Sequence, residues 1–436
     1  MEVESILKVA VIGLGVGYAL ACCLAEAGYR TVGVDIDPRV VAQPRRDASV
    51  SRLLKRRSAR MRISRFLTLT TDYTAIKTSD FVIVCVSTGD EKKLVLGHVG
   101  DSVRKALQIL RSYSTERVPI IMVYSTLPFG SSRTLRQVFE EEKVTIDKEV
   151  GYVHFPLMIA QGTTAEDFVN PPFVVFGSFD PGTAKRAMNF YRRFITRSCL
   201  LERMPAMFTG TPEEAELAKL TANAYLTTKI ALSNEVGSFC ERLGVDGQKI
   251  MEIVGSDWRI GRKFTKPGYA AGGACFPRDL KSLIEAYRNS QVEPAILVAV
   301  DTSNENRKMD PLDKVKGANL LVLGTSYKSG VRDERGSPAL DLTARLESDG
   351  YSVETYDPKF DDDQGLSAKL QGKDTVIVTI AENVFRDIGR DLGDRAKVVL
   401  DYANVVDKES IPPHVRLWQA GRGWLLQHSG LRPAGH

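Results

Sequence analysis

This chain is poor in the residues that build metal centres and disulfide frameworks. It has six cysteines and five histidines among 436 residues, with no C-x-x-C pair and no histidine spacing suited to zinc. Most of the cysteines lie in apolar runs, as reduced core thiols do, which favours a reducing compartment. The six cysteines of the chain are Cys22, Cys23, Cys85, Cys199, Cys240 and Cys275. We therefore expect no metal site and a cytoplasmic protein.

Long hydrophobic segments are also scarce. Residues 9–25 carry no charge, but these 17 residues fall short of the roughly 20 that a membrane span needs, and three glycines interrupt them. Glu2 and Glu4 replace the positive start of a secretory signal. We expect neither a membrane segment nor a targeting peptide.

Excess charge is limited as well. The net charge is +5, with 43% hydrophobic and 26% charged residues, as in an ordinary globular protein of two or three domains. Arginine and lysine crowd into residues 45–65, where Leu53, Leu54 and Met61 stand among the charges, which predicts an amphipathic surface helix. A solvated basic face is the simplest interpretation, and contact with an anionic substrate or cofactor is the alternative. We expect no nucleic-acid partner.

What is present begins with a dinucleotide-type motif. The apolar residues 9–12 predict a buried strand, and a turn follows that contains Gly13, Gly15 and Gly17. A helix is predicted over residues 19–27 and a second strand over residues 31–34. Glycines let the backbone approach a pyrophosphate at a helix N-terminus, and an acid about 20 residues on holds the ribose hydroxyls. Asp35 stands at that interval and favours NAD, with Asp37 as the competing ribose partner. The spacing G-x-G-x-G is one residue shorter than usual.

Further strands are predicted over residues 81–86 and 120–123. Each precedes a turn of small residues, the first containing Ser87 and Thr88 and the second Ser125 and Thr126. The alternation continues a parallel sheet that binds ligands at the carboxyl ends of its strands.

A long helix is predicted over residues 212–243, opened by Pro212 and closed by Gly244. Lys219 and Asn223 are four residues apart and share a helix face. An ordinary surface pair is the alternative to a functional one.

The chain then repeats its opening pattern, with strands predicted over 320–324, 353–356, 376–380 and 398–400 and a helix over 337–347. The fold predicted is α/β, with two Rossmann-like parallel-sheet domains joined by a helical central domain. We place a dinucleotide-binding domain at 1–200, a helical domain at 201–300 and a second domain with a nucleotide-type site at 301–436. The second sheet lacks a glycine fingerprint, which excludes a dinucleotide there.

The most distinctive stretch, residues 272–280, reads G-G-A-C-F-P-R-D-L. Cys275 stands at a glycine-rich bend with little bulk around it, so a substrate carbon could reach the thiol. The nearby Arg278 could favour the thiolate, and Asp279 could carry a proton. Inert packing is the alternative for a lone cysteine.

Five stretches in order resemble the UDP-glucose/GDP-mannose dehydrogenase family. They are S-T-L-P-F-G (125–130), E-A-E-L-A-K-L-T-A-N-A-Y-L-T-T-K-I (214–230), R-I-G-R-K-F (259–264), G-G-A-C-F-P-R-D (272–279) and Y-K-S-G-V-R-D-E-R-G-S-P-A-L (327–340). The second and third look more like the UDP-glucose branch than the GDP-mannose or N-acetylmannosamine branches. The match runs nearly end to end.

The resemblance implies that NAD oxidises the primary alcohol of a nucleotide sugar twice, through an aldehyde to a carboxylate. It assigns oxyanion stabilisation to Lys219 and Asn223, capture of the aldehyde to Cys275, and water and proton handling to Asp279 and Thr126. The residues it assigns to holding the nucleotide sugar are Lys219, Asn223, Arg259 (from a neighbouring subunit), Gly272, Lys328 and Arg335. It also implies that the domain at 1–200 binds NAD, that the domain at 301–436 binds the nucleotide sugar, and that the domain at 201–300, which carries the cysteine loop, forms a homodimer. Its apolar face, or the core instead, could be lined by Leu217, Leu220, Ala224 and Ile230.

The chain departs from the family near the hydrolysis and cofactor positions. Leu157 replaces a glutamate that is a base for thioester hydrolysis in the family, and Gln161 stands where a second glutamate is common. Tyr124 replaces a common acid, and the glycine turn is shortened. Hydrolysis through Asp279 alone, a modified substrate, release of an aldehyde after one oxidation, and a binder without turnover all stay open.

Overall fold

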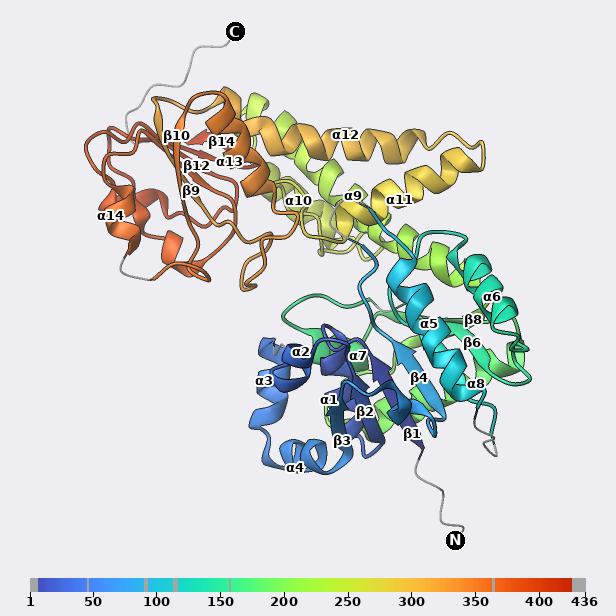
Figure 1. Ribbon diagram of the computed structural model, residues 1–436. Helices are drawn as coiled ribbons and strands as arrows, with labels where there is room; N and C mark the ends of the chain where they lie inside the picture. Colours follow the sequence, from blue (N-terminus) through green and yellow to red (C-terminus); the bar gives the residue numbers. More distant parts are fainter. Residues whose placement is uncertain are drawn as a thin grey trace. The chain divides into compact units, whose positions relative to one another are not determined.

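The computed structural model describes residues 7–44, 47–89, 93–112, 117–156, 158–362 and 365–425 (Figure 1). The chain forms two compact units, Met1–Ala222 and Asn223–His436. The boundary falls inside one long helix, α9, which spans Pro212–Leu243. In the described ranges, no helix is both long and apolar enough to cross a membrane.

The first unit is built on an eight-stranded sheet in the order β3-β2-β1-β4-β5-β6-β7-β8. All neighbours are parallel except β6 and β7, as the sequence of buried apolar runs and intervening helices predicts. The strands are β1 Lys8–Ile12, β2 Arg30–Val34, β3 Leu67–Thr70, β4 Phe81–Val84, β5 Ile120–Val123, β6 Gly151–His154, β7 Phe173–Gly177 and β8 Ala206–Gly210.

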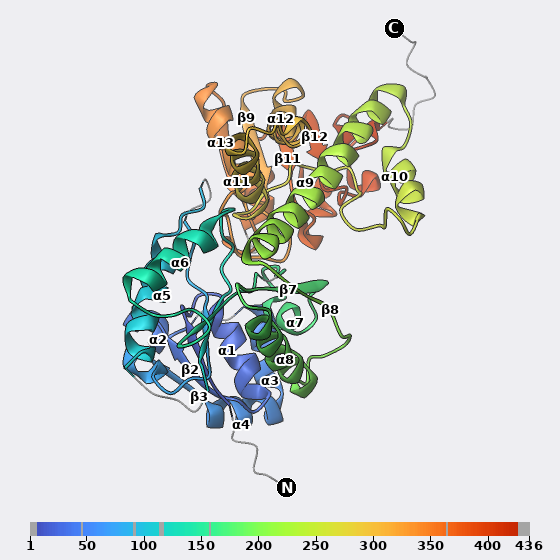
Figure 2. The same cartoon turned by 90° about the vertical axis from the view of Figure 1, so that its right-hand side faces the viewer.

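Helices cover both faces of this sheet (Figure 2). Alternate residues of β1 point to opposite sides, with Val9 and Val11 in one hydrophobic core and Ala10 and Ile12 in the other. Helices α1, α3, α4, α7 and α8 contribute to the first core, and α5 and α6 to the second. Their bounds are α1 Gly17–Glu26, α2 Pro38–Ala42, α3 Ala48–Lys55, α4 Arg57–Phe66, α5 Gly97–Leu110, α6 Ser131–Glu141, α7 Thr164–Val169 and α8 Pro181–Arg197.

The basic segment departs from the prediction of one amphipathic helix. Arg56 has extended backbone (φ −74°, ψ 114°) and divides the segment into α3 and α4. Leu53 is buried as expected, but Met61 is 63% exposed. The buried stripe of α4 is made by Ala59 and Ile63, four residues apart, so Met61 halfway between them points to solvent.

The second unit combines helices with a six-stranded sheet in the order β10-β9-β11-β12-β13-β14, parallel except for β14. The helices are α10 Gly247–Ser256, α11 Phe276–Asn289, α12 Ala295–Met309, α13 Pro338–Ser348 and α14 Leu366–Leu370. The strands are β9 Asn319–Leu323, β10 Ser352–Tyr356, β11 Thr375–Val378, β12 Val398–Asp401, β13 Arg416–Gln419 and β14 Gly423–Leu425. The predicted α/β fold with two Rossmann-like sheets and a helical centre is confirmed.

Both sheets open with the same hydrogen-bonded turn. Gly13 (φ +88°) follows β1, and its N–H donates to Val34 O at 2.8 Å, while Gly324 (φ +96°) follows β9 and donates to Tyr356 O at 2.7 Å. Asp35 accepts from Leu14 N at 2.7 Å, and Asp357 accepts from Ser326 N at 2.7 Å. Asp357 is fully buried whereas Asp35 is half-buried, so only the first turn leaves its carboxylate open to a ligand.

Candidate active site

The glycine turn after β1 keeps the form of a dinucleotide cradle despite its short spacing. A Cβ on Gly13 would lie 2.9 Å from Val86 Cγ1, and one on Gly17 would lie 2.9 Å from Val11 Cγ1. Gly13 therefore permits the left-handed turn, and Gly17 permits close packing of α1 on β1. A Cβ on Gly15 would meet no atom within 4 Å, which leaves open space at the start of α1 for a pyrophosphate.

Two carboxylates lie near the end of β2, where the sequence predicts the partner of the NAD ribose. Asp35 accepts from Leu14 N at 2.7 Å and Asp37 N at 3.0 Å, and its remaining lone pairs can accept hydroxyls. Asp37 binds Arg39 through both its oxygens, and hydrogen bonds from Arg39 lower the pKa of Asp37. The geometry favours Asp35. These residues fit NAD.

The strand-end residues of β4 and β5 gather at the same carboxyl edge as the glycine turn. Ser125 Oγ donates to Val86 O at 2.6 Å and joins the two loops, while Thr126 beside it is half-buried. Ser87 is exposed and donates to Gly89 O at 3.0 Å, whereas Thr88 is buried. Of this group, Ser87 and Thr126 therefore offer the more accessible hydroxyls.

Glu216 on α9 is a site residue that the sequence analysis did not single out. Its buried carboxylate accepts from Gly130 N and Ser132 N, each at 2.7 Å, and from Ser132 Oγ at 2.6 Å. Burial raises the pKa of Glu216 despite these hydrogen bonds. The carboxylate fixes the turn after Thr126 to α9. The available signal was its i, i+3 spacing to Lys219, which places both on one helix face.

Lys219 is buried, and its ammonium lies 3.6 Å from the thioether sulfur of Met158. The preceding residue, Leu157, which replaces a family glutamate, lies outside the described residues. Gln161 is half-buried in a turn with Gly162 (φ +94°), closed by a hydrogen bond from Thr163 N to Ala160 O at 3.3 Å. In the described part of the chain, no ion pair joins Lys219 to a carboxylate.

In the second unit, Cys275 is exposed at the N-cap of α11, a position that stabilises negative charge. Gly273 (φ +87°) donates to Gly336 O at 2.9 Å, and a Cβ on it would lie 2.7 Å from the Tyr327 ring. A Cβ on Gly272 would lie 2.4 Å from Pro338 Cδ. The cysteine loop is thus packed against the loop after β9, which only glycine allows.

Asp279 and Asn223 form a buried pair behind the cysteine loop. Asn223 Nδ2 on α9 donates to Asp279 Oδ2 at 2.6 Å, and Asp279 is fully buried in the first turn of α11. Arg278 donates to the other oxygen, Oδ1, from Nη2 at 3.2 Å. The Arg278 guanidinium, which the sequence suggested as an activator of the thiol, is therefore paired with Asp279.

The arginines expected to hold the nucleotide sugar are each aligned by an aspartate two residues earlier. Arg259, after α10, binds both oxygens of Asp257, with its Nη2 at 2.6 Å. Arg335 binds Asp333 in the same way, again at 2.6 Å. Both guanidinium groups remain more than half exposed, and Lys328 is exposed on the loop after β9. Such groups suit diphosphate oxygens.

Comparison with known proteins assigns all three parts of the chain. The UDP-glucose/GDP-mannose dehydrogenase models match over residues 7–195 (NAD binding domain), 213–306 (central domain) and 321–408 (UDP binding domain). In the described residues, no group of three or more His, Cys, Asp or Glu side chains could hold a metal.

Two of the similar curated proteins are named for different substrates. UDP-glucose 6-dehydrogenase TuaD of Bacillus subtilis is 31% identical over 369 residues, covering 80% of this chain and 76% of that protein. GDP-mannose 6-dehydrogenase of Pseudomonas putida is 28% identical over 370 residues, covering 80% and 81%.

The fold is shared with solved members. A UDP-glucose dehydrogenase from the archaeon Pyrobaculum islandicum superposes with a TM-score of 0.80 at 25% identity, covering 98% of this chain and 99% of that one. The cradle for NAD, the cysteine loop and these matches agree. The chain belongs to the UDP-glucose/GDP-mannose dehydrogenase family and is an NAD-dependent nucleotide-sugar dehydrogenase.

Proposed function

We propose that this enzyme oxidises the primary alcohol of a UDP-sugar, with UDP-glucose as the first candidate, to a carboxylate through a covalent intermediate on Cys275. The observation that carries the proposal is an exposed thiol at the N-terminus of α11, beside the buried Asn223–Asp279 pair. Gly13, Gly15, Gly17, Asp35, Ser87, Thr88 and Thr126 are the proposed NAD ligands. NAD, when bound, accepts the hydride that leaves the substrate carbon in each oxidation.

In the first oxidation the alcohol oxygen loses a proton as the carbon becomes an aldehyde. The oxygen carries developing negative charge, which Lys219 and Asn223, one turn apart on α9, are proposed to stabilise. Lys219 suits this role because its buried ammonium has a neutral thioether beside it. Its charge is therefore left for the substrate.

In the second oxidation the Cys275 thiolate adds to the aldehyde carbon, and the oxygen takes a proton to give a thiohemiacetal. Loss of a hydride from the carbon and a proton from the oxygen converts it to a thioester. Water then adds, the carbon–sulfur bond breaks, and the products are a carboxylate and the free thiolate. We propose that Thr126 and Asp279 handle the water and its protons.

A specific observation at the hydrolysis step supports an alternative to full oxidation. Both oxygens of Asp279 are already occupied, one by Asn223 and one by Arg278. A water molecule would have to compete with these two donors for the carboxylate. With Leu157 and Gln161 in place of acids, a single oxidation with release of the aldehyde is the second candidate function.

The nucleotide is proposed to bind the second unit through Lys328, Arg335 and Gly272, with Arg259 from a partner subunit. A UDP-sugar is favoured over a GDP-sugar because 259–264 and 214–230 resemble the UDP-glucose branch. The division into domains at 1–200, 201–300 and 301–436 stays part of this proposal. The six cysteines, which lie outside any disulfide, favour a reducing compartment, and we propose the cytoplasm.

A homodimer is proposed through the second unit. Leu220 and Ala224, which the sequence offered as interface or core, are buried within the chain. A different stripe of α9 is exposed, and its members lie seven, seven and four residues apart on one helix face. They are Tyr225, Leu232, Phe239 and Leu243, and Trp258 after α10 is 89% exposed. Apolar surface of this kind marks a protein interface.

The test is the yield of NADH per molecule of UDP-glucose consumed, for the wild type and for Cys275→Ser. Two NADH from the wild type would support full oxidation, and one NADH with free aldehyde would support the second candidate. GDP-mannose measured in parallel decides the nucleotide. A Cys275→Ser variant that still makes two NADH would refute the covalent route.

A further inference from the structure

The irregular segment that leads into Cys275 is held by side chains rather than by a neighbouring strand. Buried backbone N–H and C=O groups need partners, and between Pro267 and Ala271 four side chains from three helices supply them. Two of them donate only: Gln248 Nε2 to Pro267 O at 2.7 Å, and Arg307 Nε to Gly268 O at 2.8 Å. Asn234 accepts from Gly268 N at 2.8 Å and donates to Tyr269 O at 3.1 Å. Asn304 accepts from Ala271 N at 2.7 Å and donates to Ala271 O at 3.0 Å.

Asn234 and Asn304 use their amides as a strand partner would. Each is buried, and each offers one acceptor and one donor to the segment. Because the donor and the acceptor must both be matched, a shift of the segment by one residue breaks both hydrogen bonds. The two asparagines therefore fix the register of the segment as well as its position.

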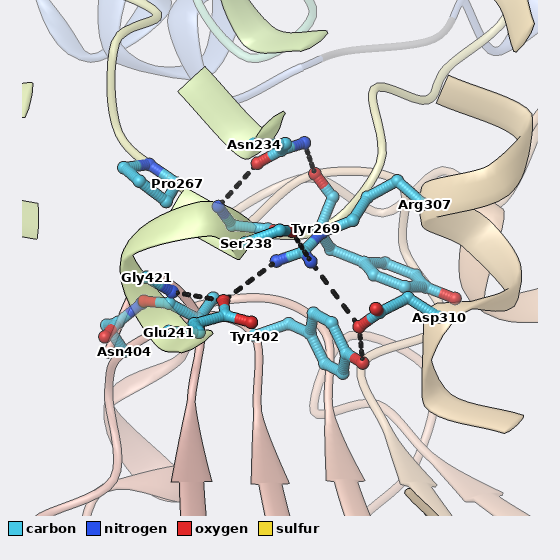
Figure 3. Close-up of polar contacts among 12 residues, drawn as sticks. Asn234, Ser238, Glu241, Pro267, Tyr269, Arg307, Asp310, Tyr402, Asn404 and Gly421 are labelled. Carbon is cyan, nitrogen blue, oxygen red and sulfur yellow. Dashed lines mark hydrogen bonds and ion pairs between the residues drawn. The ribbon is translucent and has the colours of Figure 1, made fainter. Parts of the chain in front are cut away.

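The side chains that support the segment are themselves held by polar contacts (Figure 3). Arg307 is buried, and its guanidinium lies 5.1 Å from the Tyr402 ring centroid. The same guanidinium lies 3.4 Å from the Asp310 carboxylate and donates to Ser238 Oγ at 3.2 Å. Asn234 lies on α9, the helix that carries Asn223. The same helix thus holds the segment before Cys275 and the amide that binds Asp279 after it.

Little chain separates these contacts from the thiol. Asn304 binds Ala271, Gly273 N is bound to Gly336 O, and α11 begins at Phe276 directly after Cys275. A displacement of Ala271 therefore passes to the cysteine with little slack to absorb it.

We propose that Asn234 and Asn304 are positioning residues that set where the Cys275 sulfur meets the substrate carbon. The inference rests on the proposed role of Cys275 as the nucleophile. A misplacement of about 1 Å at a reacting group can lower kcat about 100-fold, so the rate is expected to depend on these amides.

The test compares Asn304→Ala and Asn304→Asp with Asn170→Ala. Asn170 is the control, because its amide also binds backbone groups through both its donor and its acceptor, with four hydrogen bonds against the two of Asn304, but in the first unit. The readouts are kcat, KM and the ratio of iodoacetamide labelling at Cys275 to that at Cys199, measured by peptide mass spectrometry. Cys199 is the other exposed thiol and reports any general loosening.

We expect Asn304→Ala to lower kcat about 10- to 100-fold with little change in KM for NAD, and to change the labelling ratio severalfold. Asn304→Asp keeps the acceptor for Ala271 N but loses the donor, so its kcat should fall between the alanine variant and the wild type. Asn170→Ala should lower the melting temperature and leave kcat and the labelling of Cys275 unchanged. For this control the labelling is read at Cys275 alone, because Asn170 Nδ2 donates to Leu200 O, next to Cys199.

The proposal is overturned if Asn304→Ala lowers the melting temperature while kcat and the labelling ratio stay at wild-type values. If the alanine variant does not fold, the same comparison on Asn304→Asp decides. A Cys275→Ser variant that keeps full activity would instead refute the role of the thiol. The labelling ratio would still report whether Asn304 positions it.

Discussion

Replacing two glycines of the β1–α1 turn separately should distinguish cofactor binding from packing. An alanine at Gly15 meets no atom within 4 Å, and the backbone there is outside the left-handed region. Gly15→Ala should therefore leave the free enzyme as stable as the wild type, or more stable by about 0.4–1 kcal/mol because the unfolded chain loses freedom. Its methyl group occupies the space proposed for the pyrophosphate, so the affinity for NAD should fall.

Gly17→Ala should behave in the opposite way. Its Cβ would lie 2.9 Å from Val11 Cγ1 and 3.0 Å from Cys85 Cβ, both in the core between α1 and the sheet. Overpacking of this kind costs about 1–3 kcal/mol, which lowers the melting temperature of a domain of this size by about 2–12 °C.

The assay is thermal unfolding of both variants with and without NAD. A ligand at 100 times its Kd stabilises a protein by about 2.7 kcal/mol, so the wild type should show a clear upward shift of its melting temperature. Gly15→Ala should lose most of that shift at the same NAD concentration. A Gly15→Ala variant with the full shift, or a Gly17→Ala variant as stable as the wild type, would refute the assignment of the cradle.

Three further outcomes are expected. Arg278→Met should destabilise the enzyme by about 3–5 kcal/mol because Asp279 is left buried without its arginine partner. The double variant with Asp279→Asn should recover much of that loss, as measured by chemical denaturation. Burial lowers the pKa of His154 to about 3, so on acidification the unfolded state takes up a proton before the folded state does. The free energy of unfolding should therefore fall by about 2 kcal/mol between pH 8 and pH 5. Urea titrations of His154→Gln should show a smaller loss. Leu232→Glu combined with Phe239→Glu should give a folded monomer by light scattering, and a persistent dimer would place the interface elsewhere.

The parts of the fold set by local pattern were predictable. The helix expected over residues 212–243 is α9, Pro212–Leu243, because Pro212 starts it and Gly244, with φ +66°, ends it. The strand expected over 81–86 ends at Val84, since the apolar run continues past the last ladder hydrogen bonds.

The parts set by contacts between distant residues were not predictable. Glu216 reaches back 86 residues to Gly130, and Asn304 binds Ala271, 33 residues earlier. Neither contact leaves a periodic trace in the sequence. The helix break at Arg56 was missed because charge pattern alone does not show which residues of α4 are buried.

The most direct test of the account is to look for the covalent intermediate. The enzyme would be mixed with NAD and UDP-glucose, quenched in acid within one turnover, and the peptide containing Cys275 analysed by mass spectrometry. The account predicts an acyl adduct of the oxidised nucleotide sugar on Cys275, absent without NAD. Formation of the carboxylate with no adduct on that peptide, and at an undiminished rate in Cys275→Ser, would contradict it.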